Sequence, residues 1–143
     1  MTYLQALYGS QHRDLKANGY DGTKARFNGN LFLSAFVIVA LFVVLMIVLL
    51  VYPSANKAIT QFFQEVFGYS SGKMIGKLLA ILLLAIVYFG ITNTVGSEAN
   101  SSRYIEEFYR EAEAEQAGAT KKLLLPFFVL LGLLLVLALG SLF

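Results

Sequence analysis

The chain contains no cysteine and only one histidine among its 143 residues. Without cysteine there is no disulfide framework, no thiolate metal site and no cysteine nucleophile. A single histidine excludes an HExxH zinc motif and bis-histidine haem ligation, and the sequence has neither a GxSxG elbow nor a phosphate-binding glycine loop with lysine. We therefore expect neither enzyme activity nor a cofactor.

Charge is also scarce. Only 14% of the residues are charged, the formal net charge is +2, and the lysines and arginines never form a basic run. This mild, scattered charge gives no indication of nucleic-acid binding. In contrast, 57% of the residues are hydrophobic and the mean hydropathy is +0.67. One soluble domain core cannot bury so much apolar surface, so the composition predicts a membrane protein.

Three apolar runs have the length of about 20 residues that a bilayer-spanning helix needs. They cover residues 31–52, 74–95 and 123–143. The second is strictly apolar only from Leu78 to Val87 and reaches full length by including polar residues at both rims. The runs lack the alternation of a membrane β-barrel, and a lone strand cannot satisfy its backbone in lipid, so we predict helices.

The predicted fold is an all-α integral membrane protein with three transmembrane helices and short amphipathic interfacial helices on both sides. Segments 1–30 and 96–122 carry eight Lys/Arg residues, against three on the opposite side. This bias favours a cytoplasmic N-terminus and an external C-terminus. The first run starts too late and is too long for a signal peptide. Because no organelle address is visible, a bacterial inner membrane is the default location.

Segment 1–30 is predicted to begin with a short amphipathic helix over Met1–Ala17, which Asn18-Gly19 would end. Its apolar residues at helical spacing are Tyr3, Leu4, Leu7 and Tyr8. Such a helix would lie on the inner membrane surface or against a neighbour. The alternative is a partly ordered tail. His12 lacks nearby Cys, His or Asp partners, so a role as a sensor or ligand is the weaker interpretation.

Segment 53–73 carries a phenylalanine-rich stripe behind Pro53 and Ser54, which can start a helix. The stripe consists of Ile59, Phe62, Phe63, Val66 and Phe67. A helix of about 14 residues is too short to cross a bilayer. We expect an external interfacial helix that docks on the membrane or caps a bundle, with a lid over a pore as the alternative.

Segment 96–122 is predicted to form a cytoplasmic acidic amphipathic helix that Ser101 or Ser102 caps and Gly118 closes. Its apolar stripe consists of Tyr104, Ile105, Phe108, Tyr109 and Ala112. So aromatic a face on an acidic helix indicates a partner-binding surface. The partner is the N-terminal segment, a second copy of the chain or another protein.

The carboxylates of Glu107, Glu111 and Glu115 follow at i, i+4 and i+8 and would share one face of that helix. No histidine or Asp-x-Asp pattern accompanies them, and a solvated acidic face explains them equally well. We therefore predict no metal site.

Several residues are candidates for pore lining or helix packing. Lys77, Asn93 and Thr94 are the polar residues nearest to membrane depth, and Gly72 and Gly76 form a small-xxx-small pair. No charged residue occupies a span centre, which argues against a proton relay or a coupled transporter. Pro126 is interpreted as a first-turn proline of the third span.

Two functions fit this pattern. In the first, the chain is a structural or accessory subunit that packs against a larger membrane protein within the lipid bilayer. In the second, it self-associates into a channel or a membrane-permeabilising pore, because three helices alone enclose no sizeable cavity.

Overall fold

The computed structural model describes residues 1–67 and 72–141, and 88% of these residues are helical. The six helices of the described residues are α1 (Tyr3–Ala17), α2 (Lys24–Val51), α3 (Pro53–Phe67), α4 (Gly72–Asn93), α5 (Glu98–Arg110) and α6 (Glu113–Gly140). Helices α2, α4 and α6 are long and apolar enough to span a membrane. The prediction of an all-helical chain with three such helices is confirmed.

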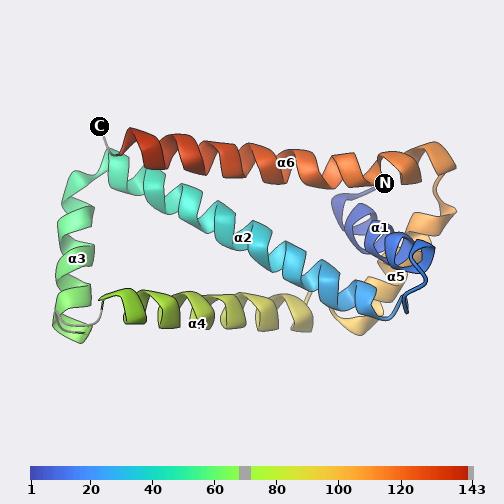
Figure 1. The fold of residues 1–143 in the computed structure, drawn as a ribbon, viewed down its shortest axis with the longest axis horizontal. Coiled ribbons are helices and arrows are strands. Elements are labelled where there is room, and N and C mark those ends of the chain that lie inside the picture. The colour runs from blue at the N-terminus through green and yellow to red at the C-terminus, as the bar shows by residue number, and fades with distance from the viewer. Residues whose placement is uncertain (68–71, 142–143) are drawn as a thin grey trace.

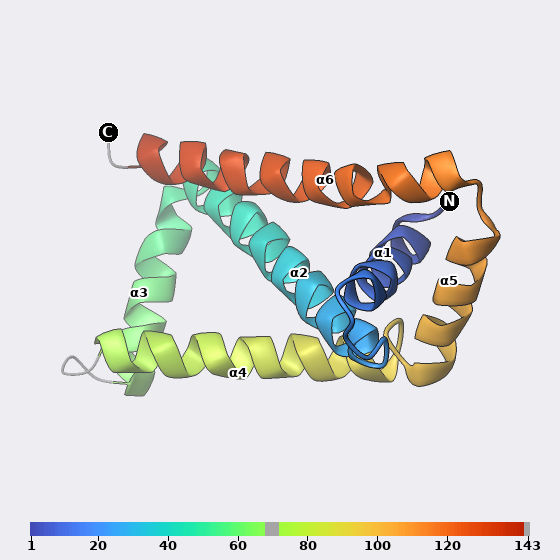
Figure 2. The ribbon, with the colours of Figure 1, turned by 45° about the vertical axis from the view of Figure 1, so that its right-hand side comes forward.

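The three long helices run in alternating directions along the long axis of the molecule (Figure 1). Helix α2 crosses diagonally between α4 and α6, while α3 lies across the far ends of α2 and α4 (Figures 1 and 2). Helices α1 and α5 gather at the other end, and the two termini lie at opposite ends of the molecule. We call residues 1–30 and 96–123 the headpiece.

Two of the long helices begin well before their apolar runs. Helix α2 starts at Lys24 rather than near Leu31, and its 28 residues span about 42 Å, more than the roughly 30 Å of a hydrocarbon core. Helix α6 starts at Glu113, ten residues before the predicted start of the third span at Leu123. The first turns of both helices therefore belong to the headpiece.

Three sequence-based expectations about α5 and α6 are wrong. The N-cap of α5 is Ser97, whose hydroxyl accepts a hydrogen bond from the Asn100 amide, rather than Ser101 or Ser102. Gly118 does not close a helix, because the break falls earlier, at Glu111 and Ala112, whose ψ angles of 157° and 148° are extended. Across this break, Gln116 Nε2 donates a hydrogen bond to the carbonyl of Glu111 over 2.9 Å. Since α6 begins just after this break, Pro126 is its fourteenth residue and lies in the interior of the helix, not in its first turn.

The packed core lies in the headpiece. Its buried residues are Ala6, Leu7, Tyr8, Phe108, Ala119 and Leu123. Along the spans, no more than 11% of the residues in the most apolar 18-residue stretch of each helix are buried. Aromatic contacts continue from the headpiece onto the spans, where Phe32 of α2 lies 5.3 Å from Phe127 of α6 between ring centroids. Helices α2 and α6 also come together at the far end of the molecule, where Leu50 of α2 and Gly140 of α6 line a common pocket (Figures 1 and 2).

Candidate functional site

Helix α1 occupies the centre of the headpiece and contacts α2, α5 and α6. Its start is a capping box: the Thr2 hydroxyl accepts a hydrogen bond from the Gln5 amide, and the Gln5 side chain accepts one from the Thr2 amide. It ends before Gly19, whose positive φ of 75° suits glycine. The predicted N-terminal helix is therefore present, and its apolar side is covered by other parts of the same chain.

The aromatic stripe of α5 meets α1. Phe108 is fully buried, and its ring lies so close to Gly9 that a Cβ atom there would overlap it. Tyr104 stacks on Tyr8 at 5.8 Å between centroids, and the Tyr109 hydroxyl lies 3.0 Å from Nδ1 of His12. Of the three partners that the sequence leaves open for this stripe, the N-terminal segment is the one in contact.

The other residues of the stripe are less enclosed. Ile105 is half-buried, and Tyr109 keeps 44% of its surface exposed. Ile105 packs against the buried core, so a surface for a further partner here would be smaller than the sequence suggests.

A buried polar network joins the headpiece to the ends of two spans. The Tyr8 hydroxyl donates to Asn30 Oδ1 over 2.7 Å. Asn30 Nδ2 in turn donates to Thr92 Oγ1 over 3.2 Å and to the Gly96 carbonyl over 3.1 Å. Burial, followed by the nearby Tyr104, raises the pKa of Tyr8 to about 12, so its phenol stays protonated and donates. One asparagine thus links α1, α2 and the end of α4.

This network was missed by the sequence analysis. Asn30 stands one residue before the first apolar run, where an Asn-Gly-Asn sequence resembles a loop boundary more than a buried helical site. Gly29 permits the arrangement, since a Cβ on it would lie 2.6 Å from the Tyr8 ring. The sequence pattern that could have indicated the network is this Asn-Gly-Asn sequence, because its polar residues stand directly before an apolar run.

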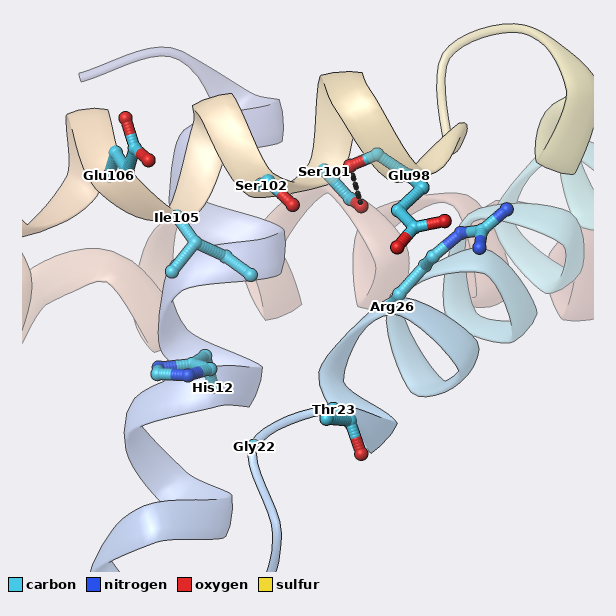
Figure 3. A pocket seen from close by; sticks show the side chains of 9 residues that line it. All are labelled: His12, Gly22, Thr23, Arg26, Glu98, Ser101, Ser102, Ile105 and Glu106. Atoms are coloured by element: carbon cyan, nitrogen blue, oxygen red, sulfur yellow. Dashed lines mark hydrogen bonds between the residues drawn. The ribbon is translucent and has the colours of Figure 1, made fainter.

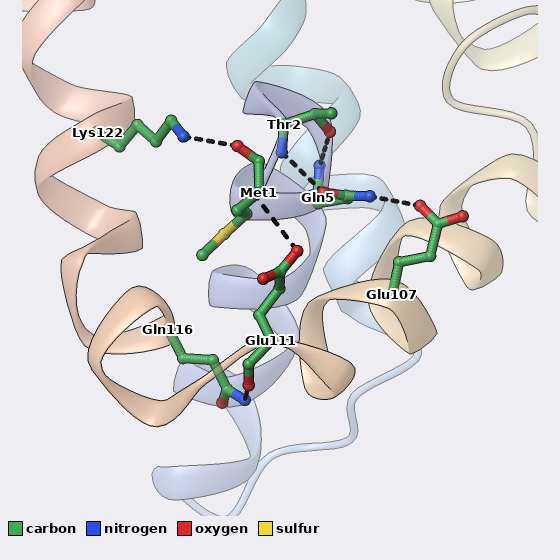
Figure 4. A network of polar contacts seen from close by, with 7 residues as sticks. All are labelled: Met1, Thr2, Gln5, Glu107, Glu111, Gln116 and Lys122. Carbon is green, nitrogen blue, oxygen red and sulfur yellow. Dashed lines mark hydrogen bonds and ion pairs between the residues drawn. The ribbon is translucent and has the colours of Figure 1, made fainter.

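A second set of polar contacts ties α1 to α5 and α6 (Figure 4). Gln5 donates to Glu107, and the Lys122 ammonium donates to the Met1 carbonyl, each over 2.6 Å. The Met1 amine lies 3.4 Å from Glu111. Glu107 and Glu111 therefore bind other headpiece groups, and because α5 ends at Arg110, Glu115 lies on a different helix, α6. The expectation that three glutamates share one face is wrong.

A further polar feature of the headpiece is a pocket of about 530 Å³ between α1, α5 and the start of α2 (Figure 3). Its lining residues are His12, Gly22, Thr23, Arg26, Glu98, Ser101, Ser102, Ile105 and Glu106. Arg26 is held by a 3.0 Å bond from its Nε to the Gly96 carbonyl. Burial, followed by the charge of Lys16, lowers the pKa of His12 below its ordinary value of 6.5, which favours the neutral imidazole.

The predicted pore or packing residues are not brought together. Gly76 and Lys77 lie near the start of α4 and Asn93 at its end, which are about 26 Å apart along the helix. All three are exposed, and the Thr94 hydroxyl donates to the Gly90 carbonyl over 2.7 Å. Gly72 is the first residue of α4, and its surroundings lie outside the described residues.

Comparison with protein-family models, curated proteins and solved structures finds no match for this chain.

Proposed function

We propose that this chain is a non-enzymatic integral membrane protein that serves as a structural or accessory subunit of a membrane assembly, with the headpiece in the cytoplasm. The observation that carries this proposal is the contrast between a headpiece that has a buried core and spans whose apolar side chains are largely exposed. Phe108 and Tyr8 are completely buried, whereas Leu125 of α6 is 69% exposed and Ile81 of α4 is 64% exposed.

The bare surfaces extend over both outer spans. On α4 the exposed apolar residues are Leu78, Ile81, Leu82, Leu84, Ile86 and Phe89, and on α6 they include Leu125, Phe128, Val129, Val136 and Leu139. Lipid can cover such surfaces, but helices associate within lipid where small residues allow close approach. Gly76 of α4 and Gly132 of α6 have open space where a side chain would stand. These positions suit packing against helices of another subunit.

The test is to purify the full chain from native membranes in a mild detergent and to measure the mass of the particle. We expect a complex heavier than one 15.8 kDa chain, with a co-purifying membrane protein. Gly132→Leu should release that protein, because the new side chain blocks close helix contact. Gly118→Leu is the matched control, since Gly118 is also an open glycine of α6 but lies within the headpiece.

Other outcomes contradict the proposal. A stable single chain without a partner would refute it. A ring of identical copies that conducts ions in liposomes would also refute it, and would favour the homo-oligomeric channel instead.

A further inference from the structure

The headpiece pocket lies at the depth of lipid headgroups if the chain spans a bilayer. Arg26 precedes the first apolar run at Leu31 by five helical residues, a distance of about 7.5 Å. Glu98 follows Val95, the end of the second predicted span, by three residues. The headgroup layer on each side of a bilayer is roughly 5–8 Å thick. Both charged residues therefore stand beside phosphates and headgroup amines rather than beside acyl chains.

The pocket carries charges of both signs that the protein itself leaves unpaired. Arg26, Glu98 and Glu106 all line the pocket, and in the view of Figure 3 Arg26 and Glu98 are drawn toward one end of it and Glu106 toward the other. Among the described residues, none of these three forms an ion pair within 4.0 Å. Since Nε of Arg26 is bound to the Gly96 carbonyl, the guanidinium is held in place while its terminal N–H groups can bind a ligand.

We propose that this pocket binds the headgroup of a zwitterionic phospholipid that carries a primary amine, such as phosphatidylethanolamine. The lipid phosphate accepts hydrogen bonds from Arg26 and from the hydroxyl of Ser102, and the lipid ammonium donates to the carboxylate of Glu98. The volume of about 530 Å³ lies within the range of about 300–1,000 Å³ that is usual for small-ligand sites.

The charge of the pocket selects against other headgroups. One arginine and two glutamates give it a net charge of −1, which disfavours a purely anionic headgroup. A simple cation is disfavoured as well, because the positively charged guanidinium of Arg26 lines the same pocket. Phosphatidylcholine has the same charges as phosphatidylethanolamine, but its quaternary ammonium has no N–H group and cannot donate to Glu98. The exposed Phe89 of α4, which lies within the second predicted span, provides apolar surface for the acyl chains.

Native mass spectrometry of the detergent-solubilised full chain tests this inference, with phosphatidylethanolamine, phosphatidylcholine and phosphatidylglycerol added at equal concentration. We expect phosphatidylethanolamine to be retained about tenfold more than either of the others, which is the effect of one charge-assisted hydrogen bond. Glu98→Gln keeps an acceptor oxygen but removes the negative charge that strengthens this hydrogen bond, so it should clearly reduce this preference. Glu113→Gln is the matched control, because both glutamates are exposed acids in the first turn of a helix but only Glu98 lines the pocket. Ser102→Leu, which fills the pocket, should lower retention of the lipid.

Equal retention of the three lipids, or a preference in Glu98→Gln that equals that of Glu113→Gln, would overturn the inference. Competition by glycerophosphoethanolamine supports recognition of the headgroup, whereas binding of that soluble compound without binding of the lipid would overturn the assignment to a membrane lipid. The inference requires that the chain spans a bilayer, but it does not depend on the proposed assembly. A single chain that retains phosphatidylethanolamine would refute the assembly alone.

Discussion

Gly9 lies where α1 passes directly beneath the ring of Phe108. A Cβ atom at this position would overlap Phe108 ring atoms, and the ring is fully buried. Tyr109 packs edge-on to that ring at 5.5 Å, and the Arg13 guanidinium stands 5.8 Å from its centroid. The ring therefore has little room to move aside, and Gly9→Ala should destabilise the headpiece.

The sign of this effect is the opposite of what helix propensity alone predicts. Replacing a helical glycine by alanine normally stabilises a helix by about 1 kcal/mol. Overpacking a core costs about 1–3 kcal/mol, and direct overlap with a buried ring corresponds to the upper end of that range. The net loss of headpiece stability is then about 2 kcal/mol. Because about 1.4 kcal/mol is a factor of ten, the open headpiece becomes roughly 30-fold more populated.

Limited proteolysis of the purified chain measures this population, since cleavage follows the open form when opening and closing are fast. Gly9→Ala should be cleaved within the headpiece about 30-fold faster than the wild type. Gly118→Ala, a helical glycine with open space around it, should be cleaved somewhat more slowly. Adding Phe108→Leu to Gly9→Ala should recover part of the loss. If Gly9→Ala is as resistant as Gly118→Ala, the described packing of α1 on α5 is incorrect.

Three further predictions follow from the headpiece. Asn30→Ala leaves the buried Tyr8 hydroxyl without its acceptor and should lower the stability measured by thermal unfolding by about 1–3 kcal/mol. Adding Tyr8→Phe to this variant should cost little more, because the hydrogen bond is already lost. If the losses of the two single variants simply add in the double variant, the network is contradicted. Because the pKa of His12 is lowered in the folded chain, the unfolded chain binds a proton first as the pH falls below about 6.5. The contribution of neutral His12 to the free energy of unfolding is thus fully present above that pH and is lost as the pH falls below it toward the lowered pKa. His12→Gln should therefore flatten the dependence of the free energy of unfolding on pH, measured by unfolding at several pH values. Since the chain has no native cysteine, single substitutions Lys16→Cys and Lys57→Cys should be labelled by an impermeant maleimide from opposite sides of a sealed vesicle, and labelling from the same side would refute the three-span topology.

The helical structure of the chain and the number of its long apolar helices could be predicted from the sequence, because both depend on local properties. The run Leu31–Tyr52 is long and apolar regardless of what surrounds it, and a lone strand in lipid would leave its backbone unsatisfied. The prediction of helix ends was weaker. Gly118 and Pro126 are common at helix ends, but the break at Glu111 and Ala112 has no such residue to mark it.

The sequence by itself determined that most of this chain is apolar helix and that three of its helices can span a bilayer, because composition and run length fix those properties. Only the tertiary structure decided that α1 is the buried centre of the headpiece, that Asn30 joins three helices, and that Arg26 and Glu98 share a pocket. The physical reason is sequence separation. Gln5 meets Glu107 across 102 positions and Asn30 meets Gly96 across 66, and such pairings are set by packing in three dimensions, which no local pattern encodes.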